Sequence, residues 1–292
     1  MSHEKEKELA RVVARMGDLP AMPGIVAEVL RLSDDPKTGM AEMSEAIQRD
    51  PALSAKILRV SNSPYYGMRG YVGTLKLALV ILGMVEVRNI ALGISIFDAL
   101  RDKTTEALLA SDFWNHAFVV AALARKLGSR LGLGMQGEDF IAGLLHDIGK
   151  LVLWRQIGQE YIDIFRAGGG RGRPLCTLEA EQLGFTHADA AAALALQWNL
   201  PKSLADAIWC HAPAGRNLDK AGNPRLAAIV RIANLAATDD YTSGTKAPTR
   251  APTEEQAWRL LDSAPTPIKK EARQDTLAAF IDELKETLVP SF

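Results

Sequence analysis

The sequence has few of the features that mark disulfide-rich, membrane or nucleic-acid-binding proteins. Its 292 residues include only two cysteines, Cys176 and Cys210, which form neither a C-x-x-C pair nor a zinc-knuckle spacing. Reduced thiols are therefore expected. The 34 basic and 35 acidic residues leave a net charge of -1, so no bulk charge attracts the chain to nucleic acid or to a membrane surface.

Long apolar runs are also missing. No run approaches the roughly 20 residues that a membrane helix needs, and the opening segment MSHEKEKELARVV has no apolar core of a signal peptide. We therefore expect a cytoplasmic protein that binds neither a membrane nor nucleic acid.

Strand signals are scarce, whereas helix boundaries are frequent. No period-2 alternation is bounded by turn residues. Asp50-Pro51 predicts a helix start, because aspartate caps a helix and proline is tolerated at its first position. Thr74 predicts a second start, for a helix that runs through Leu82 and ends at Gly83. The pattern indicates an all-α fold.

Two further helices are predicted in the same way. Ser111 can cap a helix over 112–127 that Gly128 ends. Thr253 and Gln256 have the spacing of a capping box before another apolar segment.

The length allows one large domain or two ordinary ones. Short helices precede Leu100, and every candidate metal ligand follows it. We therefore predict an N-terminal helical part over residues 1–100 and a helical bundle with C-terminal helices over residues 101–292.

A His-Asp pair lies in the most apolar segment of the second part. His146 and Asp147 occur in FIAGLLHDIGKLVL. Burial of an imidazole and a carboxylate is costly unless something pairs with them, and a divalent metal would do so. Lys150 follows one turn later, where its ammonium could meet a phosphate.

Three more histidines and an asparagine stand at suggestive places. His116 shares a helical face with apolar residues, and His187 follows Thr186, a plausible helix cap. His211 ends a helical segment, where it could simply interact favourably with the helix dipole. Asn234 lies on an apolar helix face, either as a core hydrogen-bonding residue or as a weak ligand.

The order of these residues resembles the HD superfamily of metal-dependent phosphohydrolases, with LLHDIGK as the most specific segment. The superfamily pattern is a histidine, a His-Asp pair and a later aspartate, and Asn234 stands where that aspartate is expected. HD-GYP phosphodiesterases also have a histidine at the His187 position and a His-His pair where this chain has His211-Ala212. Their Gly-Tyr-Pro motif is absent here.

The N-terminal segments LPAMPGIVAEVLRLSDDP and IQRDPALSAKILRVSNSPYYG resemble the opening of the HDOD family, a relative of the HD superfamily. The segment EAEQLGFTHADAAAALALQWNLP resembles its later half. The resemblance implies an N-terminal helical bundle packed on an HD-like bundle that contains the relict site. It also implies a bacterial signal-transduction output module.

The resemblance leaves three functions open. The first is a non-catalytic regulatory module with a degenerate metal site, acting through protein or small-ligand binding. The second is an active metal-dependent phosphohydrolase on a nucleotide, a cyclic dinucleotide or another phosphate ester, in which Asp147 and Lys150 would be catalytic and Asp239 or Asp240 could replace the missing carboxylate. In the third, the metal only staples the helices together.

The resemblance also implies a ligand set and partners. The ligand set is His116, His146, Asp147, His187, His211 and Asn234, which suits one or two ions of iron, manganese, zinc or nickel; an empty site is the alternative. A signalling protein is the expected partner and a nucleotide or phosphate the alternative ligand, with the oligomeric state left open.

Overall fold

The computed structural model describes residues 12, 21–35, 37–62, 66, 70–100, 112–168, 174–212, 216–243 and 251–287. Within them the chain forms helices and no strand, which confirms the all-α fold class. The helices fall into two compact units. The N-terminal unit consists mainly of Ala21–Arg101 and also includes the chain from Asp282, whereas the C-terminal unit consists mainly of Asp102–Ile281.

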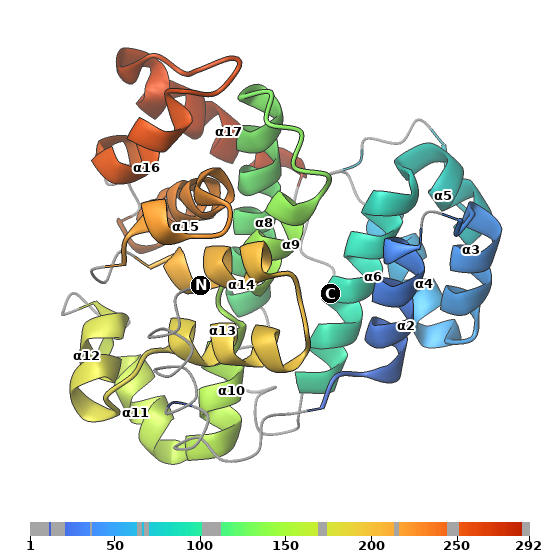
Figure 1. The fold of residues 1–292 in the computed structure, drawn as a ribbon, viewed down its shortest axis with the longest axis horizontal. Helices are drawn as coiled ribbons and strands as arrows, with labels where there is room; N and C mark the ends of the chain where they lie inside the picture. The colour runs from blue at the N-terminus through green and yellow to red at the C-terminus, as the bar shows by residue number, and fades with distance from the viewer. Residues whose placement is uncertain are drawn as a thin grey trace. The chain divides into compact units, whose positions relative to one another are not determined.

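Between residues 21 and 100 the described residues form helices that are drawn in blue to teal in Figure 1. They are α2 (Gly24–Asp34), α3 (Met40–Gln48), α4 (Pro51–Ser61), α5 (Leu75–Leu82) and α6 (Met84–Leu100). Helix α6 packs against α2, α4 and α5. One face of α5 remains exposed and carries the apolar side chains of Leu77, Val80 and Ile81.

Two helix starts in this unit are confirmed as predicted. The Asp50 carboxylate accepts a hydrogen bond from the Leu53 amide at 3.0 Å, and Pro51 is the first residue of α4. The Thr74 hydroxyl accepts one from the Leu77 amide at 3.1 Å, and α5 ends at Gly83, whose φ is 84°. Both boundaries depend on contacts within a few residues, so the local sequence suffices to predict them.

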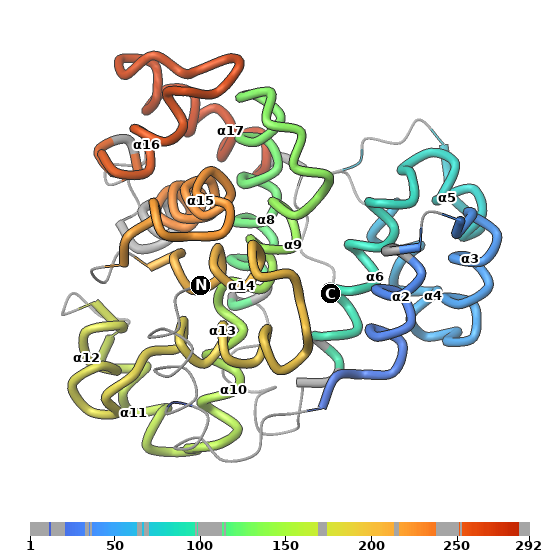
Figure 2. Tube along the Cα trace, in the orientation of Figure 1, coloured from blue at the N-terminus to red at the C-terminus, as the bar shows by residue number. Residues whose placement is uncertain are grey.

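The C-terminal unit is larger, and Figure 2 traces its path. Among the described residues its α-helices are α8 (Asp112–Arg130), α9 (Glu138–Leu145), α10 (Ile148–Ile157), α11 (Gln159–Gly168), α12 (Leu175–Gln182), α13 (His187–Gln197), α14 (Lys202–Cys210), α15 (Pro224–Ser243), α16 (Glu255–Leu261) and the part of α17 (Arg273–Thr287) up to Ile281. Short 3₁₀ turns occupy Leu218–Lys220, Ala251–Thr253 and Lys270–Ala272. Helix α15 packs against α8, α9, α14 and α16, and α13 packs between α10 and α14.

The predicted end of α8 is wrong. The helix continues past Gly128 to Arg130, and Ser111, its predicted cap, lies outside the described residues. A Cβ atom on Gly128 would lie 2.6 Å from a carboxylate oxygen of Asp139 on α9. Glycine is therefore present for the close approach of α9, which has no local sequence signal.

The predicted capping box of Thr253 and Gln256 is also wrong. Helix α16 begins at Glu255, with Glu254 as its cap residue. The Gln256 amide instead donates to the Asn217 side-chain oxygen at 2.7 Å. A contact between residues far apart in sequence has replaced the local one.

None of the helices in the described part of the chain is both long enough and apolar enough to cross a membrane.

Candidate metal centre

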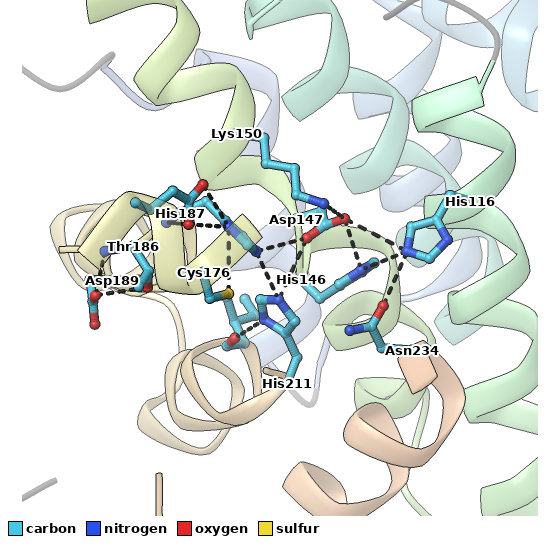
Figure 3. Close-up of polar contacts among 12 residues, drawn as sticks. His116, His146, Asp147, Lys150, Cys176, Thr186, His187, Asp189, His211 and Asn234 are labelled. Atoms are coloured by element: carbon cyan, nitrogen blue, oxygen red, sulfur yellow. Dashed lines mark hydrogen bonds and ion pairs between the residues drawn. The ribbon is translucent and has the colours of Figure 1, made fainter. Parts of the chain in front are cut away.

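His146 and Asp147 lie at the junction of α9 and α10. His146 is fully buried, and Asp147 is nearly so. Asp147 caps α10 with a non-helical backbone, φ −97° and ψ 3°. The break in the helix lets both side chains enter the centre of the C-terminal unit, where the other histidines converge on them (Figure 3).

Two glycines flank the pair and bring neighbouring helices close to it. A Cβ atom on Gly143 would lie 2.7 Å from the Ala121 Cα on α8. One on Gly149 would overlap the His187 carbonyl oxygen and lie 2.7 Å from the Ala191 nitrogen. The backbones of α9 and α10 therefore touch α8 and α13 directly, which places His187 beside Asp147.

The orientation of the His146 ring is determined by its own helix. Its Nδ1 lies 2.6 Å from the Gly143 carbonyl oxygen, which can only accept a hydrogen bond, so Nδ1 carries the proton. In the neutral ring Nε2 is then an acceptor. It faces the His116 Nε2 at 3.3 Å and the Asp147 Oδ2 at 3.2 Å.

His187 and His211 approach the other oxygen of the same carboxylate. The His187 Nε2 lies 3.2 Å from the Asp147 Oδ1 and 3.2 Å from the His211 Nε2. The His211 Nε2 is 3.5 Å from the same oxygen. The His211 Nδ1 donates to the Ile208 carbonyl at 2.6 Å. This histidine therefore satisfies a carbonyl at the end of its own helix and also directs Nε2 into the site. These two histidines and Asp147 are buried, and we call them the deep half.

A buried carboxylate holds His187 from behind. Glu179 accepts hydrogen bonds from the His187 Nδ1 at 2.7 Å, from the His187 amide at 3.0 Å and from the Tyr161 hydroxyl at 2.7 Å. The Cys176 sulfur lies 4.0 Å from the same Nδ1. Burial alone would lower the pKa of His187, but the Glu179 charge raises it well above its usual value.

His116 and Lys150 form the exposed side of the site. The side chains of His116 and Lys150 are 18% and 17% exposed, compared with 3% for Asp147. The His116 Nε2 lies 3.1 Å from the Asn234 Oδ1 and 3.6 Å from the Asp147 Oδ2. The Lys150 ammonium donates to that Oδ2 at 2.5 Å. His116, His146, Asp147 and Asn234 make up what we call the open half.

Burial and the neighbouring charges set the ionisation of these groups. Burial would raise the pKa of Asp147, but His146 and Lys150 hold it well below its usual value. Burial and the neighbouring His146 lower the pKa of His116 to about 3. The same two causes hold the pKa of His211 well below its usual value. The carboxylate is therefore charged at neutral pH, whereas His116 and His211 are neutral.

The structure thus brings together all six residues that the sequence suggested as ligands, and Lys150 with them (Figure 3). Asp239 and Asp240 belong to α15, but their side chains lie outside the described part of the chain. Sequence reasoning missed Glu179 and Tyr161. Both look like ordinary surface positions of amphipathic helices, and only tertiary packing buries them.

The donor set fits a divalent cation. The deep half places two imidazole nitrogens and a carboxylate oxygen within 4.8 Å of one another, and so does the group of His116, His146 and Asp147 in the open half. The Nε2 of neutral His211 is an acceptor and points at a carboxylate oxygen, and two acceptors repel each other unless a cation or proton lies between them. Imidazole and carboxylate ligands suit iron, manganese, zinc and nickel.

The comparisons with known proteins agree with this architecture. The model of the HDOD domain family matches residues 19–213, more than half of the chain. An uncharacterized protein of Treponema pallidum (strain Nichols) is 25% identical over 206 residues, which cover 70% of this chain and 40% of that protein. The match therefore spans less than half the length of this relative.

Solved structures show the same fold. A protein of Shewanella amazonensis SB2B, named as a candidate phosphohydrolase, is 24% identical with a TM-score of 0.70, and 99% of each chain is covered. An HDOD domain protein of unknown function from Geobacter sulfurreducens is 20% identical with a TM-score of 0.74, covering 98% of this chain and 95% of that one. A candidate signal transduction protein of Marinobacter aquaeolei VT8 is 22% identical with a TM-score of 0.66, covering 96% of this chain and 66% of that one.

Proposed function

The chain belongs to the HDOD domain family, and from this premise we propose that it is a regulatory output module whose degenerate HD site holds a divalent metal without hydrolysing a phosphate ester. The observation that carries the proposal is the contact between Asn234 and His116, whose Oδ1 and Nε2 atoms are 3.1 Å apart. A neutral amide stands where the superfamily pattern has a carboxylate. Loss of that negative charge weakens divalent-metal binding and the activation of water.

Metal retention is supported by the convergence of acceptors. In the deep half, His187, His211 and Asp147 would hold an ion. In the open half, His116, His146 and Asn234 would hold an ion together with the same Asp147 carboxylate. A divalent ion supplies positive charge and Lewis acidity there. Glu179 would orient His187 through Nδ1 and keep its Nε2 directed at the site.

Regulation through a protein partner is supported by the exposed face of α5. Leu77, Val80 and Ile81 recur at helical spacing, and Val80 is 63% exposed. Exposed apolar patches mark surfaces that bind other proteins. The similar Marinobacter structure, named as a candidate signal transduction protein, agrees with this role.

A phosphohydrolase is the second candidate, and Lys150 favours it. Its ammonium lies on the exposed side of the site, within 2.5 Å of the Asp147 Oδ2. A phosphate ester that entered beside His116 would meet this cation, which could stabilise the phosphoryl oxygens.

Substitution Asn234→Asp tests the proposal. The purified chain and the variant are titrated with Mn²⁺ and assayed on p-nitrophenyl phosphate, bis(p-nitrophenyl) phosphate and a cyclic dinucleotide. We expect about tenfold tighter Mn²⁺ binding by the variant, because one charged ligand is restored. We expect no turnover by the wild-type chain above that of His146→Ala. Wild-type turnover that His146→Ala abolishes would instead establish the phosphohydrolase.

A further inference from the structure

We propose that Arg216 is a positioning residue that sets the separation of His187 and His211, and through it the metal affinity of the deep half. The inference rests on the proposed function, because it assigns that half as a metal site. Arg216 touches neither histidine. Instead it joins the two chain segments that carry them.

The first segment is the start of α13, where His187 is the first helical residue. Thr186 and Asp189 form a capping box around it. The Asp189 Oδ2 accepts from the Thr186 amide at 2.7 Å and from the Thr186 hydroxyl at 2.8 Å. One carboxylate oxygen of Asp189 therefore ties Thr186, which precedes His187, to Asp189, which follows it, and leaves the other oxygen for further partners.

The second oxygen of Asp189 accepts hydrogen bonds from the chain segment that carries His211. The Arg216 guanidinium donates to the Asp189 Oδ1 at 2.7 Å and to the Thr186 hydroxyl at 2.7 Å. The Trp209 indole donates to the same Oδ1 at 2.7 Å. Trp209 lies in the last turn of α14, two residues before His211.

Arg216 also grips α14 directly. Its second terminal nitrogen donates to the Trp209 carbonyl at 2.8 Å, and its guanidinium stacks over the Trp209 ring, 4.7 Å from the ring centroid. The two terminal nitrogens of Arg216, which form a planar fork, thus link the start of α13 to the end of α14. The two histidines carried by these ends place their Nε2 atoms 3.2 Å apart.

Helix α15 completes the connection. The Arg231 Nε donates to the Cys210 carbonyl at 2.8 Å, and a terminal nitrogen donates to the Arg216 carbonyl at 3.0 Å. Arg231 lies one turn before Asn234 on the same helix. Three ligand-bearing elements therefore meet through Arg216 and Arg231.

Stability alone gives no reason for a charged pair at this position. Arg216 and Asp189 are both buried, and replacement of a buried ion pair by apolar groups is often neutral for stability. The planar guanidinium fixes the orientation of its partners, because its N–H groups point at fixed angles and bind several acceptors at once. Groups that orient ligands from behind typically change metal affinity about 10- to 100-fold.

The test compares Arg216→Met with the wild-type full chain. Arg225→Met is the control, because Arg225 lies at the start of α15 and donates to Ser263 instead of to either histidine-bearing segment. The first readout is the separation of the His187 and His211 Nε2 atoms in a crystal structure of each chain without added metal. The second is the Kd for Mn²⁺, measured by competition with a fluorescent chelator.

For Arg216→Met we expect a longer separation and about 10- to 100-fold weaker Mn²⁺ binding, with wild-type values in Arg225→Met. A folded variant with wild-type separation and affinity would overturn the inference, even if it melted earlier. If Arg216→Met does not fold, Arg216→Lys keeps the charge without the fork and is judged by the same two readouts. If the wild-type chain binds no Mn²⁺, the proposed metal site fails, and the separation alone decides the role of Arg216.

Discussion

Burial and a neighbouring carboxylate set the protonation of three histidines in this site, and the pKa shifts have opposite signs. The pKa of His116 is lowered to about 3 and that of His211 falls well below its usual value, because burial disfavours the charged ring. Burial acts on His187 in the same direction, yet the Glu179 carboxylate raises its pKa well above the usual value. Without metal, His187 can therefore donate from both nitrogens, to Glu179 and to Asp147.

These shifts predict how the stability of the metal-free protein depends on pH. Unfolded histidines take up protons below about pH 6.5, whereas folded His116 stays neutral until about pH 3. The unfolded state then binds more protons, so the free energy of unfolding falls as the pH drops from about 6.5 towards 3. His187 acts oppositely, because the stability from its raised pKa is present below about pH 6.5 and is lost as the pH rises through the folded value.

Urea unfolding in the presence of a chelator, at pH 7 and at pH 5, measures this effect. A single histidine that stays neutral in the folded state costs up to about 2 kcal/mol between these two pH values. We expect His116→Gln to lose less stability over this interval than the wild-type chain, by up to that amount. Equal losses in the two proteins would mean that His116 titrates normally in the folded state.

At the scale of the elements, the site depends on close helix packing around the HD motif. Helix α13 is rich in alanine, and its alanines from Ala188 to Ala195 are buried. Gly149 on α10 faces this surface with no side chain of its own. Small residues on both helices let the two backbones touch, and this contact brings His187 to the Asp147 carboxylate at 3.2 Å.

Gly149→Ala should therefore destabilise the protein. An alanine within a helix normally stabilises it by about 1 kcal/mol relative to glycine. Here the added methyl group would overlap the His187 carbonyl and the Ala191 nitrogen, and overpacking costs about 1–3 kcal/mol. Gly24→Ala is the control, because nothing lies within 4 Å of a Cβ atom there.

Chemical denaturation of both variants measures the difference. We expect a loss of stability for Gly149→Ala, and no loss or a small gain for Gly24→Ala. A Gly149→Ala variant as stable as the wild-type chain would show that α10 and α13 are not in backbone contact.

At the scale of the whole molecule, the sequence predicts what local contacts determine. The all-α class and the helix starts at Pro51 and Leu75 depend on caps and periodicity within a few residues. Gly128 does not end its helix as predicted, because the residue makes room for a side chain on another helix, and no local pattern in the sequence reveals that contact. Long-range packing thus limited the prediction of helix boundaries.

The same limit applies to the site. The histidines were found because LLHDIGK and the order of the other ligands resemble a known family. The residues behind them carry no such signal: Glu179 contacts His187 directly, and Arg216 binds the segments that carry His187 and His211. Each acts across a gap in sequence, Glu179 eight residues from His187 and Arg216 thirty from Thr186. A charged residue gives no sign in the sequence that folding will bury it against a ligand.

The metal content of the full chain tests the central claim most directly. Elemental analysis is made on protein purified without a nickel column and without chelator, beside the double variant His146→Ala with Asp147→Ala. The account predicts about one or two equivalents of a transition metal in the wild-type chain, and none in the double variant. A folded wild-type chain without metal, which also fails to take up Mn²⁺, Fe²⁺ or Zn²⁺ when these are added, would contradict it.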